Sequence, residues 1–347
     1  MEDYSKHIIK SGATVLDAFK SLEQLKTKDL DLFVESEDGK IIGAVTDGDL
    51  RRGLIAGAAL DDKVDSVMNR GFVSFCKDFI DISLLKKYKA KGISLIPELD
   101  SNGRIVEIYN IRVLRSILPV DAVLMAGGKG ERLRPLTEKT PKPLLPVGDK
   151  AIIDHNIDRL IEYGVKHISV TVNYLGEQLE EHFKEPRGEV LVNTVREPKF
   201  LGTIGSIRFV SEFHNDTILV MNSDLFTNIN YEDFYLHFKE HDADMSVAAV
   251  PYDVDIPLGV LNLEGRNITG LTEKPHFGYY ANAGIYLIKR SALDLIPDDK
   301  MFHSTDLVET LIAAGGKVIR FPLNGTWIDI GTPQEYRRAN DMVKYMH

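Results

Sequence analysis

A glycine-rich segment near the middle of the chain has residue types that suit phosphate binding. The segment AGGKGERLRPLT begins at Ala126 and contains Gly127, Gly128 and Gly130. Because glycine has no Cβ, the backbone N–H groups of such a turn can come close to phosphate oxygens. Arg132 adds a planar cation that can hold two oxygens at once. We therefore interpret this segment as a phosphate-binding loop.

Two common phosphate-binding patterns do not fit this loop. A Walker A motif would close on Gly-Lys-Ser or Gly-Lys-Thr, and the dinucleotide-binding pattern would have a third glycine where Leu133 stands. A P-loop kinase and a nicotinamide-dependent dehydrogenase are therefore disfavoured. The loop is followed instead by PKPLLPV, which begins at Pro141 and contains Lys142.

Two carboxylates follow apolar stretches in the second half of the chain. Thr217 to Met221 runs into Asn-Ser-Asp224, and the segment WIDIGTP contains Asp329. Asp224 could simply be a turn or cap residue at a strand end, and Asp329 could belong to a turn before a helix that starts with Thr332 as N-cap. Alternatively, both are hard oxygen ligands of the kind that Mg²⁺ takes together with substrate phosphates.

The string GGxGxRLxPLT followed by PKPLLPV is similar to the signature of the sugar-phosphate nucleotidyltransferases, and residues 120–347 resemble that family throughout. The sequences of these two motifs are most similar to those of mannose-1-phosphate guanylyltransferases and of CBS-linked hexosamine-1-phosphate guanylyltransferases. The resemblance implies transfer of a nucleotidyl group, GMP from GTP in preference, to a sugar 1-phosphate by in-line attack at the α-phosphate. It implies Arg132 and Lys142 as catalytic cations, and Asp224 and Asp329 as ligands of a Mg²⁺ cofactor.

The same resemblance assigns the remaining binding residues. It implies a set of nucleotide contacts: Gly127, Gly128, Gly130, Asn173, Gly202 and Thr203. It also implies a set of sugar-phosphate contacts: Gly259, Glu273, Lys274 and Asn282. Glu273 and Lys274 could instead be an exposed pair before Pro275. Trp327, the sole tryptophan, is expected to pack in the core.

Elements that could position these residues are visible in the periodicity after Pro119. Apolar strands, such as His167 to Val172, alternate with helical stretches, such as Ile152 to Tyr163. This alternation predicts a doubly wound, mostly parallel, Rossmann-like α/β domain over residues 119–347. Ligands of such domains bind beyond the carboxyl ends of the strands, which is where the candidate residues lie.

Residues 1–118 contain a weak repeat offset by 64 positions, DGKII at Asp38 against NGRIV at Asn102. Each copy is predicted to form a helix, two strands joined by a turn, and a closing helix. The helices that open the copies are expected at Thr14 to Leu25 and at Asp81 to Ala90.

The segment GAVTDGDLRR, which begins at Gly43, resembles the closing strand and helix of a CBS motif, two of which form a Bateman module. In that family the residues matching Thr46 and Asp49 hold the ribose of a purine nucleotide, whereas the second copy has Asn110 and Val113 there. One regulatory nucleotide per chain is therefore implied. The competing hypothesis is a purely dimerising pair, in which Asp49 only stabilises a helix start.

Length, charge and cysteine content limit the partners and the location that we expect for the protein. The chain has 347 residues, a formal net charge of -10 and one cysteine, Cys76. We expect no nucleic-acid partner, no membrane segment, a cytoplasmic location and a homo-oligomer. Two alternatives stay open, a uridylyltransferase of the same family and a nucleotide-sensing regulator with an inactive transferase domain. Neither the sugar nor the base can be chosen with certainty from the sequence.

Overall fold

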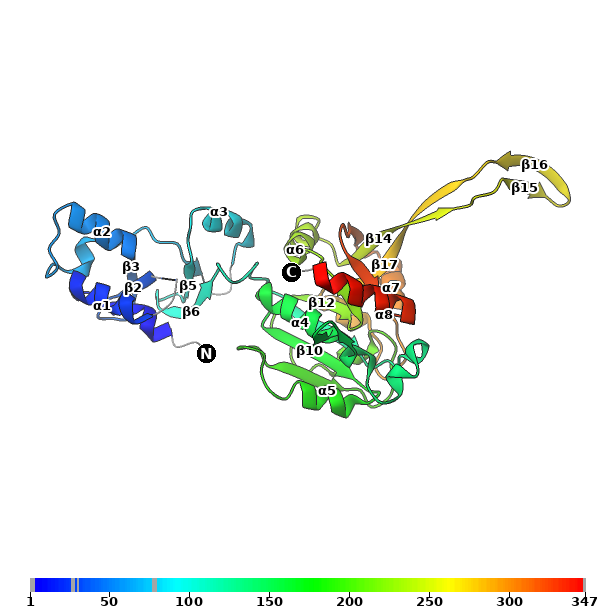
Figure 1. Cartoon of the computed structure of the whole chain (residues 1–347), viewed down its shortest axis with the longest axis horizontal. Coiled ribbons are helices and arrows are strands. Elements are labelled where there is room, and N and C mark those ends of the chain that lie inside the picture. The colour runs from blue at the N-terminus through cyan, green and yellow to red at the C-terminus, as the bar shows by residue number, and fades with distance from the viewer. Residues whose placement is uncertain (1–3, 26–28, 30, 77–79, 346–347) are drawn as a thin grey trace. The chain divides into compact units, whose positions relative to one another are not determined.

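The computed structural model describes residues 4–25, 29, 31–76 and 80–345 and contains two compact units. Unit 1 comprises Met1–Ile117 with Glu162–Gly164, and unit 2 comprises Leu118–Ile161 with Val165–His347. Figure 1 labels the helices and strands of both units. Among the described residues, no helix combines the length and apolar character needed to cross a bilayer.

Unit 1 contains two similar halves, each with a three-stranded sheet. The first half has strand order β1-β2-β3, and its elements are β1 (Ile8–Lys10), α1 (Val15–Leu25), β2 (Asp31–Glu35), β3 (Ile41–Thr46) and α2 (Asp47–Ile55). The second half has strand order β4-β5-β6, and its elements are β4 (Phe75–Cys76), α3 (Leu85–Ala90), β5 (Leu95–Leu99) and β6 (Ile105–Asn110). Phe33 and Ile41 of the first half pack with Leu95 and Ile108 of the second, so the two halves share a small core.

The closing helix predicted for the second copy is wrong. Only a single turn follows β6, in which the N–H groups of Val113 and Leu114 donate to the carbonyl of Asn110 at 3.3 and 3.1 Å. The next carbonyls, of Leu114 and Arg115, accept from Nζ of Lys89 at 2.7 and 2.8 Å. The N–H of Arg115, which would have to continue the helix, donates instead to the carbonyl of Glu162 at 2.6 Å, so the helix ends after one turn.

Unit 2 is built around a seven-stranded sheet of order β11-β10-β7-β12-β17-β14-β18. Its strands are β7 (Asp121–Ala126), β10 (His167–Val172), β11 (Val192–Arg196), β12 (Thr217–Asn222), β14 (Met245–Asp255), β17 (His276–Lys289) and β18 (Val318–Pro322). Strand β17 runs antiparallel to both of its neighbours, and the other adjacent pairs are parallel. This confirms the predicted mostly parallel α/β fold.

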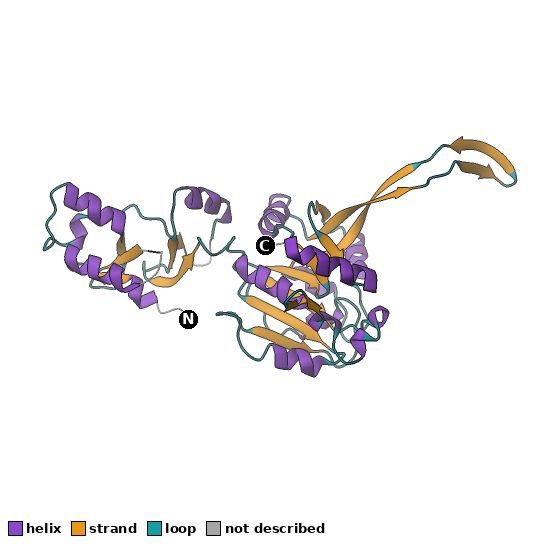
Figure 2. Cartoon of the chain, viewed as in Figure 1, coloured by secondary structure: helices purple, strands orange, loops and turns teal. Residues whose placement is uncertain are grey.

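Five helices accompany the sheet and lie on both of its sides (Figure 2). They are α4 (Ile152–Glu162), α5 (Gly176–His182), α6 (Tyr231–Glu240), α7 (Ser304–Ala313) and α8 (Pro333–Met342). Strands β7, β10 and β12 are buried along nearly their whole length, which requires cover on both faces. The buried strands therefore hold their carboxyl ends rigidly, and the loops that follow them are placed by the sheet.

Three small antiparallel ladders complete unit 2: β8 (Pro146–Val147) with β9 (Lys150–Ala151), β13 (Leu225–Thr227) with β19 (Trp327–Asp329), and β15 (Val260–Glu264) with β16 (Asn267–Thr272). Strands β14 and β17 continue beyond the sheet as a twisted pair, with β15 and β16 at its tip (Figure 1). We refer to residues 251–280 as the ribbon.

Candidate active site

A cleft of about 390 Å³ lies where the predicted nucleotide-binding and catalytic residues meet. Its lining includes nine of the candidates or their neighbours: Gly127, Gly128, Gly130, Arg132, Lys142, Gly202, Thr203, Asp224 and Gly331. The glycine-rich loop follows β7, and Asp224 follows β12, which is the parallel neighbour of β7. The sheet thus brings together segments that are distant in the sequence, at the edge expected for an α/β ligand site.

The glycine positions of the loop differ in what surrounds them. Gly130 has a left-handed backbone with φ of +60°, and a Cβ on Gly127 would lie 2.2 Å from Oε1 of Glu197 and 3.3 Å from Cβ of Asn173. A Cβ on Gly128 would meet no heavy atom within 4 Å, so its backbone faces open space. A larger residue would therefore strain the backbone at 130 and displace Glu197 at 127, whereas there is open space beside Gly128.

Asp224 and Asp329 are neighbours through the β13–β19 ladder. Asp329 pairs with Leu225, and the N–H of Ile330 donates to the carbonyl of Asp224 at 3.1 Å. Nζ of Lys142 forms an ion pair with Oδ2 of Asp224 and lies 3.9 Å from Oδ1 of Asp329. The Lys142 side chain is only 9% exposed, so its charge is placed by the fold rather than left in solvent.

The carboxylate pair fits a magnesium ion of the kind bound with a nucleotide. Oδ1 of Asp224 is buried without a hydrogen-bond partner among the described residues, which leaves one hard oxygen available. Burial, and then the charge of Asp224, raises the pKa of Asp329 above its ordinary value. No group of three His, Cys, Asp or Glu side chains in the described part of the chain could hold a metal ion. Two carboxylates would therefore need phosphate oxygens and water to complete the coordination of Mg²⁺.

Arg132 is held beside this centre by Gly331. A Cβ on Gly331 would lie 2.9 Å from Nη2 of Arg132, so the guanidinium lies against the glycine backbone. Thr332 is the N-cap of α8 and Pro333 is its first residue, as predicted. The helix start thus accounts for Thr332 and Pro333 without Asp329, whose carboxylate lies beside Lys142.

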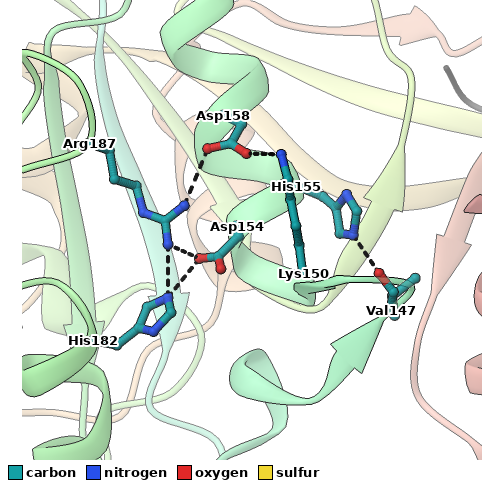
Figure 3. Close-up of polar contacts among 7 residues, drawn as sticks. All are labelled: Val147, Lys150, Asp154, His155, Asp158, His182 and Arg187. Atoms are coloured by element: carbon teal, nitrogen blue, oxygen red, sulfur yellow. Dashed lines mark hydrogen bonds and ion pairs between the residues drawn. The ribbon is translucent and has the colours of Figure 1, made fainter.

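A polar network fixes the segment that follows Lys142 (Figure 3). Nε2 of His155, on α4, lies 2.8 Å from the carbonyl of Val147, and Nζ of Lys150 lies 2.6 Å from Oδ2 of Asp158. These contacts tie the β8–β9 hairpin to α4. The PKPLLPV segment therefore has an anchored end close to Lys142.

Asp154 forms the buried end of the same network. Its Oδ1 lies 2.8 Å from Nε2 of His182 and accepts from Nη2 of Arg187 at 2.6 Å (Figure 3). Burial alone would raise the pKa of Asp154, but the hydrogen bond from His182 and the charge of Arg187 hold it below its ordinary value. The ionised carboxylate links α4, α5 and the loop of Arg187.

Gly202 and Thr203 form another edge of the cleft. Gly202 has φ of +84°, and a Cβ there would lie 2.5 Å from the carbonyl oxygen of Phe302. Oγ1 of Thr203 accepts from the N–H of Ser304 at 2.9 Å, at the start of α7. Both residues are therefore held by the segment before α7 while they line the cleft.

Glu197 lines the cleft, although the sequence patterns did not single it out. It is only 4% exposed, lines the cleft, and accepts from the N–H of Leu201 through Oε2 at 3.2 Å. Burial raises the pKa of this carboxyl above its ordinary value. The signal that could have found it is its position directly after β11, because carboxylates at strand ends in such a sheet face the ligand side.

The predicted sugar-phosphate residues are divided between two places. Asn282 lines a second cleft of about 310 Å³ together with Trp327 and Asp329, and Thr203 lines both clefts. Trp327 is half-buried there and donates from Nε1 to the carbonyl of Ala283 at 2.9 Å, rather than packing inside the core. This cleft is therefore continuous with the carboxylate pair.

The remaining three sugar-phosphate candidates are exposed on the ribbon. Gly259, Glu273 and Lys274 line neither of the two clefts. Gly259 and Glu273 are neighbours, since a Cβ on Gly259 would lie 3.1 Å from Oε2 of Glu273. Within one chain the structure thus gathers most of the nucleotide-binding candidates at the first cleft, without Asn173 in its lining, but keeps the Glu-Lys pair apart from both clefts.

The chain is similar in sequence to several curated proteins. Mannose-1-phosphate guanylyltransferase catalytic subunit beta from Xenopus tropicalis is 29% identical over 227 residues, which cover 62% of this chain and 62% of that protein. Bifunctional protein GlmU from Methanocaldococcus jannaschii is 32% identical over 229 residues, which cover 64% of this chain and 53% of that protein. The chain therefore spans less than two thirds of the length of these curated relatives.

Solved structures show the same fold. The crystal structure of HddC from Yersinia pseudotuberculosis matches with a TM-score of 0.52 and 24% identity, and the match covers 65% of this chain and 99% of that one. The family described as Nucleotidyl transferase matches residues 121–345, which include the glycine-rich loop, both carboxylates and Lys142. Because this match covers well over half of the chain, the chain belongs to the Nucleotidyl transferase family.

Proposed function

We propose that unit 2 transfers a nucleotidyl group from a nucleoside triphosphate, GTP in preference, to a sugar 1-phosphate, with Mg²⁺ as cofactor. The observation that carries the proposal is the convergence of Lys142, Asp224 and Asp329 at the end of a glycine-rich loop. A phosphate oxygen of the sugar 1-phosphate attacks the α-phosphorus. The bond to the β-phosphate breaks, and pyrophosphate leaves with the electron pair.

The protein's contribution to this reaction is positioning and charge. Arg132 suits the departing β- and γ-phosphates, because its planar fork can hold two oxygens. Lys142 supplies a compact, preorganised charge for the α-phosphate oxygens, which become more negative as the bonds rearrange. Asp224 and Asp329 would hold Mg²⁺, which supplies further neutralisation of phosphate charge.

Glu197 supports the preference for guanine. The Watson–Crick edge of guanine presents two adjacent donors, N1–H and N2–H, which an ionised carboxylate can accept together. Uracil presents one donor between two carbonyl oxygens, and adenine and cytosine each place an acceptor beside their amino group. A buried carboxylate at the cleft would therefore select guanine, because the other bases leave it poorly paired.

The proposal is tested by measuring pyrophosphate release. Four nucleoside triphosphates are each combined with several sugar 1-phosphates. We expect turnover with GTP and with mannose 1-phosphate or a hexosamine 1-phosphate; the printed name of the Xenopus tropicalis relative agrees with guanylyl transfer to mannose 1-phosphate. Glu197→Gln should reduce the ratio of kcat/KM for GTP over UTP about tenfold or more. Glu232→Gln is the matched control, since Glu232 on α6 is 5% exposed and lines neither cleft. An unchanged ratio in Glu197→Gln would overturn the base assignment.

A second candidate function is a nucleotide-sensing regulator with an inactive transferase domain. The cleft argues against this function, because it keeps a buried lysine close to two carboxylates, and we would not expect an inactive site to retain that arrangement. Absence of pyrophosphate release with every substrate pair in the panel would favour the regulator over the enzyme.

For unit 1 we propose a pair of CBS motifs, one of which binds a purine nucleotide at Thr46 and Asp49. The similar halves and their shared core support the pairing. Asp49 already accepts from the N–H and Oγ1 of Thr46 at 2.9 and 2.7 Å, and from Arg52 at 2.6 Å. This capping box stabilises the start of α2, so a ribose would have to replace some of these contacts.

A further inference from the structure

The first turn of α4 is bonded to the segment that carries Lys142. The N–H of Ile152, the first residue of α4, donates to the carbonyl of Leu145 at 3.0 Å, and the N–H of Leu145 donates to the carbonyl of Lys142 at 3.1 Å. Further along the same turn, Nε2 of His155 lies 2.8 Å from the carbonyl of Val147 (Figure 3). The backbone of Lys142 is therefore two hydrogen bonds away from α4.

Asn156, the residue after His155, bonds the same helix to the segment that carries Asp224. Asn156 is only 1% exposed, and its Nδ2 donates to the carbonyl of Leu225 at 2.7 Å. The ring of His155 meets the ring of Phe226 edge-on, with centroids 5.4 Å apart. His155 and Asn156 lie three and four positions after the first residue of α4, so all three share one face of the helix. That face therefore contacts both the lysine segment and β13.

The carbonyl of Leu225 takes no part in the β13–β19 ladder. The N–H of Ile330 donates to the carbonyl of Asp224 at 3.1 Å. Because hydrogen-bonded and non-hydrogen-bonded pairs alternate along an antiparallel ladder, Leu225 and Asp329 form a non-hydrogen-bonded pair. The carbonyl of Leu225 therefore points away from β19, and Asn156 satisfies it from α4. Without this amide, β13 would have to move for its buried carbonyl to find another donor.

Apolar contacts hold the same segments together but do not fix their spacing. Four buried side chains, two from the lysine segment and one each from β13 and β19, pack in one core: Leu145, Val147, Phe226 and Ile328. The hydrophobic effect is not directional, whereas a hydrogen bond fixes the position of one atom against another. The side chain of Lys142 is a flexible four-carbon stem, so its distance from Asp224 depends on where the two segments are held. Both segments are bonded to one turn of α4, along which four residues rise about 6 Å.

We propose that Asn156, with His155 beside it, is a positioning residue that holds Asp224 and Asp329 at the distance from Lys142 that their ion pairs require. Nζ of Lys142 pairs with Oδ2 of Asp224 and lies 3.9 Å from Oδ1 of Asp329. Since β13 and β19 are paired, a shift of β13 would move both carboxylates relative to the lysine. The spacing rests on the contacts of α4, whereas its effect on turnover rests on the proposed transferase function.

A double-mutant cycle, followed by urea unfolding of the full chain in Mg²⁺-free buffer, tests the positioning without reference to activity. Asn156→Leu keeps the size of the side chain and removes the donor. In this background Lys142→Met should lower the urea midpoint by about half or less of what it does in the wild type, because the carboxylates are no longer held beside the lysine. Asn156→Ser, which adds no bulk, takes the place of Asn156→Leu if that variant does not fold.

Arg159→Met is the matched control for this cycle. Arg159 is also on α4 and donates from Nη2 to a backbone carbonyl at 2.7 Å, but that carbonyl belongs to Ile229, beyond the end of β13. In this background Lys142→Met should lower the urea midpoint as much as it does in the wild type, because distant sites add. Equal falls of the midpoint in all three backgrounds would overturn the proposal.

Steady-state kinetics tests the consequence for turnover. With the substrates that the wild type accepts, kcat of Asn156→Leu should fall about 10- to 100-fold at saturating substrate and Mg²⁺, since a misplacement of about 1 Å can cost on the order of 10²-fold. KM for the nucleotide should change less than about threefold, and Arg159→Met should keep both parameters within about twofold. An equal fall of kcat in Arg159→Met would overturn a role specific to Asn156. A wild-type chain without turnover, whose urea midpoints still depend on Asn156 as expected, would refute the transferase proposal and leave the positioning in place.

Discussion

Lys142 is the residue whose removal gives the most informative test of the candidate active site. Its Nζ pairs with Asp224 and lies 3.9 Å from Oδ1 of Asp329, and its side chain is 9% exposed. Lys142→Met keeps a long apolar stem and removes the charge. The two carboxylates would then lose the cation that lies close to both of them, at a place where Oδ1 of Asp224 is already buried and has no hydrogen-bond partner among the described residues.

The expected loss can be bounded from these contacts. Removing one partner of a fully buried ion pair costs about 3 to 5 kcal/mol. The side chains of Asp224 and Asp329 are 24% and 41% exposed, and solvent weakens their repulsion. We therefore expect the free energy of unfolding to fall by about 2 to 3 kcal/mol in Mg²⁺-free buffer. With Mg²⁺ and nucleotide bound, the metal replaces part of the missing charge, so the loss should be smaller.

The assay combines urea unfolding, with and without Mg²⁺ and nucleotide, and steady-state kinetics. Turnover by Lys142→Met should fall by about 10² to 10³ at saturating substrates, because the preorganised charge acts in the transition state. Lys150→Met is the matched control. Its ion pair with Asp158 at 2.6 Å is about half exposed, so its loss should cost about 0 to 1 kcal/mol and leave turnover unchanged.

Two results would refute this reasoning. If Lys142→Met is no less stable than Lys150→Met, the lysine does not compensate the carboxylates in the fold. If only KM rises while kcat is intact, Lys142 binds ground state and transition state equally and has no preferential role in the chemistry.

The remaining predictions concern the proposed metal ligands, the glycines and unit 1. Asp224→Asn and Asp329→Asn should each nearly abolish turnover with the fold retained, and near-normal rates at saturating Mg²⁺ would reject that ligand assignment. Gly202→Ala should lower the free energy of unfolding by about 1 to 2 kcal/mol or more, because the backbone there is left-handed and the added Cβ would meet the carbonyl oxygen of Phe302. Gly128→Ala should leave stability unchanged and raise KM for the nucleotide, and equal stabilities of the two variants would contradict this difference. Asp49→Ala should cost about 0.5 to 2 kcal/mol by loss of the capping box. In calorimetric titration it should also weaken purine nucleotide binding to the full chain about 5- to 150-fold; wild-type protein that binds no such nucleotide at unit 1 would leave only the dimerising role.

Local sequence patterns were sufficient for the elements that depend on near neighbours. The strand predicted from His167 to Val172 is β10 without change, and Thr332 and Pro333 begin α8 as the capping pattern indicated. A run of apolar residues, or a cap followed by proline, acts through contacts a few residues away, so the sequence carries the whole cause. The glycine-rich loop and the two carboxylates were recognisable for a similar reason, since their residue types limit the chemistry they can do.

Contacts between distant segments decided the rest. Glu197 lines the cleft because β11 pairs with β10 and its end lies beside Gly127; its place after a strand was visible in the sequence, but the pairing of that strand was not. The closing helix of the second repeat ends after one turn, because the N–H of Arg115 donates to the carbonyl of Glu162 rather than within a helix. The pairing of β14 with β17 placed Lys274 on the ribbon although its motif resembles a cleft residue. In each case the burial and charge of a residue depend on which distant segments of the chain meet. The residue types determined which chemistry is available. The tertiary structure decided where in the molecule that chemistry can be used.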